Sequence, residues 1–121
     1  MKIAITTSGD SLAAPLDSRF GRAPRFLLLE LADGSFTLVD NRQNLDAAQG
    51  AGIQAAQNLA ATGARALITG HCGPKAFRVL QAAGIQVYTT PGAPTVAAAV
   101  EAYRAGRLQP LAAADVEGHW A

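Results

Sequence analysis

The chain has 121 residues, half of them hydrophobic, which suffices for one compact domain with a core and is too short for two. Its formal net charge is +1 and charged residues make up 16% of the chain, so it has neither the basic surface of a nucleic-acid-binding protein nor the acidic excess of a disordered tail. No apolar run reaches the roughly 18 residues of a membrane span, and we expect a soluble cytoplasmic protein that binds neither nucleic acid nor membrane.

The amino-terminal part is expected to form three strands. Residues 2–7 are a short β-branched run, typical of a buried strand. The segments 25–31 and 35–41 follow as two antiparallel strands, because the Asp33-Gly34 pair between them suits a tight hairpin turn.

Helices and strands alternate in the rest of the chain. Helical spacing and glycine stops predict helices at about 50–62, 74–83 and 94–105, with strands at 64–69 and 85–90 between them. Short links between alternating elements favour parallel strands joined by right-handed crossovers. The sequence therefore predicts an α/β protein with a mixed sheet and helices on its faces.

The first candidate site is "TGHCGPKAF", residues 69–77, where a strand turns into a helix. Pro74 fits the first helical position, and Gly70 and Gly73 allow backbone shapes that are closed to other residues, so the turn needs no function to exist. Ligands of open α/β sheets nevertheless lie beyond the carboxyl ends of strands, where a helix amino terminus favours negative charge.

The chemistry of this turn comes from three neighbouring side chains. Cys72 is the only cysteine and cannot form an internal disulfide, so it serves packing, ligation or reactivity. A thiolate beside His71 would suit a soft metal or an iron–sulfur species, and Lys75 adds a positive charge. One cysteine and one histidine are fewer than the four ligands of a usual tetrahedral site. A structural turn, an anion or cluster site and a catalytic thiol all stay open.

The second candidate site is "LDSRFGRAPRF", residues 16–26. It ends a connection longer than the ~12–15 residues usual in compact domains, a length that indicates a functional or mobile segment. Arg19, Arg22 and Arg25 lie three residues apart, so two or three guanidinium groups could face one anion. The alternative is a solvated loop in which Asp17 pairs with an arginine and Phe20 packs into the core.

The third candidate is the tail Gly118-His119-Trp120, which would lend His119 as a ligand if it folded over a site. Chain ends are usually frayed, and this is the simpler interpretation.

Two stretches together resemble a known family. They are "DSRFGRAPRF" after the first strand and "GAGIQAAQNLAATGARALITGHCGPKAFRVLQAAGIQVY" from residue 50 to 88. The chain resembles the dinitrogenase iron–molybdenum cofactor biosynthesis family, which includes NifX, NafY and the carboxyl-terminal domain of NifB. The resemblance covers about residues 1–106, so we expect one domain there and a tail at 107–121.

The resemblance implies a ribonuclease H-like three-layer fold, with a five-stranded mixed sheet in the order 3-2-1-4-5 flanked by helices. It also implies a carrier or scaffold for iron–sulfur or iron–molybdenum cofactor precursors rather than a hydrolase. Nuclease activity is disfavoured, since a ribonuclease H site needs clustered acidic metal ligands and the strands offer mainly Glu30 and Asp40. The cofactor-binding positions implied by the resemblance are Arg19, Phe20, Gly21, Arg22, Gly70, Gly73 and Pro74.

We therefore predict a small non-enzymatic carrier of a metallocluster, with its ligand in a crevice between the 16–25 loop and the 70–75 turn. Cys72 is the expected sulfur ligand, His71 a second ligand or hydrogen-bond donor, and Arg19, Arg22 and Lys75 the charge partners, with His119 as a further candidate ligand. Cluster donor and acceptor proteins are the expected partners of a monomer or homodimer. The alternatives are a metal-free regulator that binds a small anion or nucleotide, and an enzyme with a thiol nucleophile.

Overall fold

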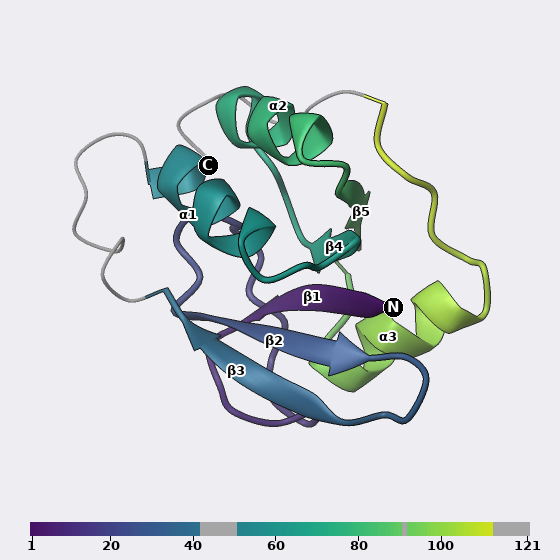
Figure 1. The fold of residues 1–121 in the computed structure, drawn as a ribbon. Helices are drawn as coiled ribbons and strands as arrows, with labels where there is room; N and C mark the ends of the chain where they lie inside the picture. The colour runs from purple at the N-terminus through teal and green to yellow at the C-terminus, as the bar shows by residue number, and fades with distance from the viewer. Residues whose placement is uncertain (42–50, 91, 113–121) are drawn as a thin grey trace.

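The computed structural model describes residues 1–41, 51–90 and 92–112, which form one mixed sheet with helices on both faces (Figure 1). The strands are β1 (Lys2–Thr7), β2 (Arg25–Glu30), β3 (Phe36–Asp40), β4 (Ala66–Thr69) and β5 (Gln86–Thr89). The helices are α1 (Ala51–Ala60), α2 (Pro74–Ala82) and α3 (Val96–Arg104).

The strand order is β3-β2-β1-β4-β5, so the predicted α/β class and the predicted order are confirmed. β1 pairs antiparallel with β2, and β2 with β3, whereas β4 runs parallel to both β1 and β5. The three parallel strands therefore end at the same edge of the sheet, where the loop after β1 and the turn after β4 begin.

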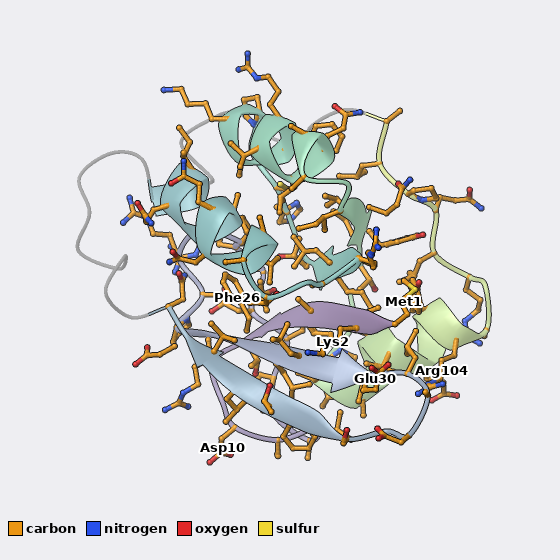
Figure 2. All side chains as sticks on the ribbon, in the orientation of Figure 1. Met1, Lys2, Asp10, Phe26, Glu30 and Arg104 are labelled. Carbon is orange, nitrogen blue, oxygen red and sulfur yellow. The ribbon has the colours of Figure 1, made fainter. Side chains whose placement is uncertain are left out.

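Apolar side chains cover both faces of the sheet, because successive residues of a strand point to opposite sides. α1 and α2 pack on one face, and Phe26 lies between the sheet and α1 (Figure 2). α3 packs on the other face. Strands buried on both sides need runs of apolar sequence, as at residues 3–5 of β1 and 26–29 of β2.

The start of α3 differs from the expected position. A helix was expected from residue 94, but α3 begins at Val96 because Thr95 caps it. Thr95 has extended backbone, and its hydroxyl oxygen accepts a hydrogen bond from the Ala98 N–H at 3.1 Å.

The segment after α3 returns along the outer edge of β5. Tyr88 forms an antiparallel bridge with Pro110, and the Leu111 N–H donates to the Val87 carbonyl at 2.7 Å. Within the described part of the chain, no helix is long and apolar enough to cross a membrane.

Candidate functional site

The loop after β1 and the turn after β4 meet at the carboxyl edge of the sheet. Arg19 and His71 form a parallel backbone bridge, and the Phe20 N–H donates to the His71 carbonyl at 3.3 Å. The two segments singled out from the sequence thus lie against each other. A ligand that touches both would rest on the surface they share, and the crevice expected between them is closed at this contact.

Gly70 allows this contact. A Cβ atom added at Gly70 would lie 2.6 Å from both Cα and the carbonyl oxygen of Ser18, closer than Cβ atoms come to backbone. Neither Gly70 nor Gly73 has a positive φ, so the expected reason for these glycines, an unusual backbone shape, is wrong. At Gly70 the reason is the close approach of the 16–25 loop.

Two buried threonines hold the start of the loop. Thr6 near the end of β1 lies beside Thr69, the last residue of β4, and their hydroxyl oxygens are 2.9 Å apart. The Thr6 hydroxyl also lies within hydrogen-bond distance, 2.7 Å, of the Asp17 carbonyl, while the Asp17 N–H donates to the Thr6 carbonyl at 2.9 Å. Both threonines are fully buried. Sequence reasoning missed this pair, although each threonine stands near the carboxyl end of a predicted strand.

The middle of the loop is anchored by Phe20 and Asn41. The Phe20 ring is fully buried and stacks on Phe26, with ring centroids 5.5 Å apart. The Asn41 side-chain amide donates to the carbonyls of Gly21 at 3.4 Å and Ala23 at 2.8 Å. Phe20 and Gly21 therefore shape the loop from inside, and Asn41 is a second residue that sequence reasoning missed.

The amino terminus of α2 opens on the same edge. Gly73 is the N-cap residue, with φ −77° and ψ 169°, and no side chain caps the first turn. Pro74 takes the first helical position, as its missing N–H favours. Backbone N–H groups at such a terminus carry partial positive charge and attract anions.

The basic side chains differ in their surroundings. Arg19 and Lys75 are exposed, whereas Arg22 is half-buried. The Arg25 guanidinium donates to the Gly9 carbonyl at 3.3 Å, so it fixes the loop. Asp17 accepts a hydrogen bond from the backbone N–H of Arg19 at 3.0 Å. Arg19 and Lys75 are therefore the most accessible cations of the candidate site.

Cys72 lies beneath this surface. Its side chain is fully buried in the apolar core that includes Phe20 and Phe77, and its thiol donates to the Gly73 carbonyl at 3.7 Å. His71 is half-buried. Ligation by the Cys72 sulfur stays a prediction, and it would require the turn to open.

The described residues contain no group of three or more His, Cys, Asp or Glu side chains that could hold a metal ion. The predicted ligand His119 lies outside these residues. What the site offers is exposed cations and backbone N–H groups. Such donors suit the outer atoms of an anionic ligand, not a bare metal ion.

Comparison with known proteins places the chain among relatives of the same fold. The apo form of the orange protein from Desulfovibrio gigas is 42% identical and has a TM-score of 0.92 over 95% of this chain and 96% of that one. A Thermotoga protein described as a candidate NifB protein is 34% identical, with a TM-score of 0.83 over 97% of this chain and 98% of its own. The uncharacterised protein MJ0580 of Methanocaldococcus jannaschii is 31% identical over 91 residues, 73% of each chain. The model of the dinitrogenase iron-molybdenum cofactor family matches residues 1–106, and the chain therefore belongs to that family.

Proposed function

We propose that the protein is a small carrier or scaffold for an iron–sulfur or iron–molybdenum cofactor, or a precursor of one, during metallocluster assembly, and that it catalyses no reaction. Its cargo would be an anionic cluster that is already assembled. Membership of the dinitrogenase iron-molybdenum cofactor family supports this role.

Charge is the proposed means of recognition. Sulfide-rich clusters are anionic, and their sulfur and oxygen atoms accept hydrogen bonds from guanidinium, ammonium and backbone N–H groups. Arg19 supplies such a group from the loop, Lys75 supplies one from the turn, and α2 adds the positive end of its dipole. The described residues contain no set of metal-ligating side chains. This agrees with a protein that contacts the outer sulfur and oxygen atoms of the cluster and does not ligate its metal ions.

The backbone bridge between Arg19 and His71 is the observation that carries the proposal. Through it the segments that follow β1 and β4, far apart in the sequence, lie side by side, and Arg19 and Lys75 belong to these two segments. The buried Thr6–Thr69 pair and the stacked Phe20 ring hold this backbone in place before any ligand binds. The loop and the turn therefore lose little conformational entropy when a ligand binds.

Titration with tetrathiomolybdate under anaerobic conditions tests this function, because this anion carries molybdenum and sulfur. We expect Arg19→Gln/Lys75→Gln to bind at least about tenfold more weakly, since it removes two charge-assisted hydrogen-bond donors. The control Arg65→Gln/Arg107→Gln removes the same charge from exposed positions away from the loop and the turn. Equal weakening by both double variants would contradict a localised site.

The Cys72→Ala variant tests sulfur ligation separately. Because the sulfur is buried, we expect this variant to bind tetrathiomolybdate as tightly as the parent. Reconstitution with iron and sulfide, followed by elemental analysis, extends the test to clusters built on the protein. A loss of bound metal at unchanged thermal stability would establish Cys72 as a ligand.

A metal-free anion-binding regulator is the second candidate function, and the absence of a side-chain cap at Gly73 favours it. A helix amino terminus without a side-chain cap suits a phosphate group. This alternative predicts that phosphorylated ligands raise the melting temperature while tetrathiomolybdate does not. The reverse result supports the carrier.

A further inference from the structure

The two edge strands of the sheet differ in what covers their outer sides. The outer edge of β5 is covered by the bridge from Tyr88 to Pro110 and the hydrogen bond from Leu111. β3 is the opposite edge strand, and no other strand of the described ranges pairs with its outer side. Edge strands are usually protected by charged side chains, proline or a bulge. β3 carries a charge only at its last residue, Asp40, and its pairing with β2 runs without interruption from Leu29↔Phe36 to Arg25↔Asp40.

β3 also exposes large apolar side chains. Phe36 is 38% exposed and Leu38 is 40% exposed. Because they pair with Leu29 and Leu27, whose side chains lie in the core under α3, both stand on the α3 face of the sheet. The apolar edge is thus confined to one face.

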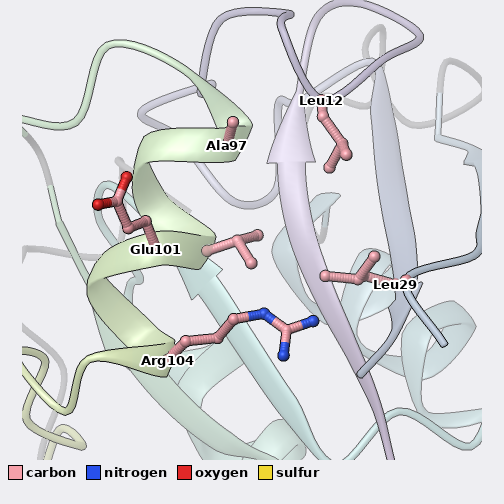
Figure 3. Close-up of a pocket in the computed structure, with 7 residues that line it drawn as sticks. Leu12, Leu29, Ala97, Glu101 and Arg104 are labelled. Carbon is pink, nitrogen blue, oxygen red and sulfur yellow. The ribbon is translucent and has the colours of Figure 1, made fainter. Parts of the chain in front are cut away.

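A groove of about 300 Å³ lies on this same face, between α3 and the strands (Figure 3). Leu12 and Leu29 line one side, and Ala97 and Val100 of α3 line the other. Phe36 is the β3 neighbour of Leu29 in the sheet register, so the exposed apolar edge begins next to a residue that lines the groove.

The backbone hydrogen bonds show which groups of β3 point outward. The Glu30 N–H donates to the Ser35 carbonyl at 2.8 Å, and the Asn41 N–H donates to the Pro24 carbonyl, also at 2.8 Å. In an antiparallel pair the residues bonded to the neighbouring strand alternate. The N–H and C=O groups of Phe36 and Leu38 therefore point away from β2, toward the outer edge.

We propose that a second copy of this chain pairs antiparallel with β3, around a twofold axis at Thr37. Phe36 then lies opposite the partner's Leu38, and Leu38 opposite the partner's Phe36. Their outward N–H and C=O groups form the hydrogen-bonded pairs of the ladder. All four apolar side chains meet on one face, Thr37 lies opposite the partner's Thr37, and no like charges oppose each other.

The proposed pairing gives a closed dimer. Since the chain covers its own β5 edge, the β3 pairing uses the edge strand of each copy and yields a dimer in place of a filament. The twofold axis stands perpendicular to the sheet, so both α3 helices lie on the same side, and the two grooves flank the joined apolar side chains. The carboxyl edges of the parallel strands face away from each other, and both candidate sites stay accessible. The dimer does not depend on the proposed function.

Sedimentation equilibrium of the full chain, from about 10 μM to about 1 mM for an interface of this small size, tests the dimer. We expect the mass to rise toward that of two chains. In Leu38→Pro the missing N–H is one that points outward, so the ladder with β2 stays intact while the dimer is lost. A single-chain mass for the parent at all concentrations, or an undiminished dimer in the folded Leu38→Pro variant, would overturn the proposal.

Two oppositely charged double variants test the same interface if the proline variant does not fold. Phe36→Lys/Leu38→Lys should be monomeric because like charges would face each other, and mixing it with Phe36→Glu/Leu38→Glu should restore dimers. The control Gln57→Lys/Gln81→Lys adds the same charge on exposed positions of α1 and α2 and should dimerise like the parent. Failure of the mixture to dimerise, or equal loss in the control, contradicts pairing at β3.

Oxidative cross-linking tests the register. Cβ atoms of directly opposed residues lie about 4.5–5.5 Å apart, close to the range that a disulfide spans. Thr37→Cys should therefore form a covalent dimer quickly, whereas Ser35→Cys, opposite the partner's Val39, should not. The native thiol does not compete, because Cys72 is fully buried. Faster cross-linking of Leu38→Cys than of Thr37→Cys would overturn the axis at Thr37.

Discussion

At the scale of single residues, Gly70 decides whether the loop and the turn can touch. In Gly70→Ala the new Cβ atom would meet backbone atoms of Ser18 at 2.6 Å, and backbone cannot rotate aside as a side chain can. We expect the free energy of unfolding to fall by about 1–3 kcal/mol, the usual cost of overpacking. Urea denaturation followed by circular dichroism measures it.

Gly92→Ala is the matched control for this substitution. Gly92 has no heavy atom within 4 Å of an added Cβ and no positive φ. Its free energy of unfolding should change by no more than about 0.5 kcal/mol. If Gly70→Ala is as mild as Gly92→Ala, the close contact described for the loop is wrong.

The buried threonine pair gives a second prediction at this scale. Thr6→Val keeps the shape of the side chain but leaves the Thr69 hydroxyl and the Asp17 carbonyl without this partner, so we expect a loss of about 1–3 kcal/mol in unfolding free energy. Thr69→Val should also destabilise. The double variant should lose less than the two single losses added together, because no threonine hydroxyl then stays buried without its partner. Strict additivity in this double-mutant cycle would mean that the two hydroxyls do not interact.

At the scale of elements, periodicity in the sequence was enough to locate the strands and helices of the described ranges. Ile3 and Ile5 alternate with Ala4 in a buried strand, and such local patterns depend on neighbours only a few residues away. The order of the strands came from the family resemblance. The start of α3 was missed because Pro94 looked like a first helical residue, whereas the Thr95 hydroxyl provides the cap.

The candidate site was only partly visible in the sequence. Glycine, arginine and proline marked the loop and the turn, but the threonine pair depends on a parallel register in which Ile5 lies beside Ile68, and no local pattern contains that register. For Cys72 the sequence left packing, ligation and reactivity open, because no local pattern shows whether its sulfur is covered. The core that buries it includes Phe20, distant in the chain.

The turn between β2 and β3 gives a prediction on pH. The hydroxyl of Ser35, and then its backbone N–H, bond to the Asp33 carboxylate and lower the pKa of Asp33 from its ordinary value of 3.8. A lowered folded-state pKa stabilises the protein above the ordinary value, and this contribution is lost as the pH falls through the folded-state pKa. Ser35→Ala should raise the pKa of Asp33 toward the ordinary value, as NMR titration of its carboxyl carbon would show. An unchanged titration curve would contradict the role of the hydroxyl.

At the scale of the whole molecule, the proposed cargo surface and the proposed dimer surface lie at different edges of one sheet. The cargo surface lies at the carboxyl ends of β1 and β4, whereas the dimer surface lies along β3. β2 separates β3 from β1, so neither surface contains a strand of the other. This separation means that cargo binding and dimerisation should act independently, which distinguishes the molecule from a carrier whose site is completed by its partner.

Hydrogen–deuterium exchange can test that independence, because amide exchange slows where binding suppresses local opening. Tetrathiomolybdate at constant protein concentration should slow exchange of the amides of residues 17–22, 71–73 and 75–76 and leave those of Phe36 and Leu38 unchanged. Raising the protein concentration without tetrathiomolybdate should slow exchange at Phe36 and Leu38 and leave the amides of the loop and the turn unchanged. Arg19→Gln/Lys75→Gln should abolish only the first effect, and Leu38→Pro, followed at the amide of Phe36, only the second. If tetrathiomolybdate slows exchange in β3 as strongly as in the 71–76 turn, the two surfaces are coupled and the assignment of separate edges is wrong.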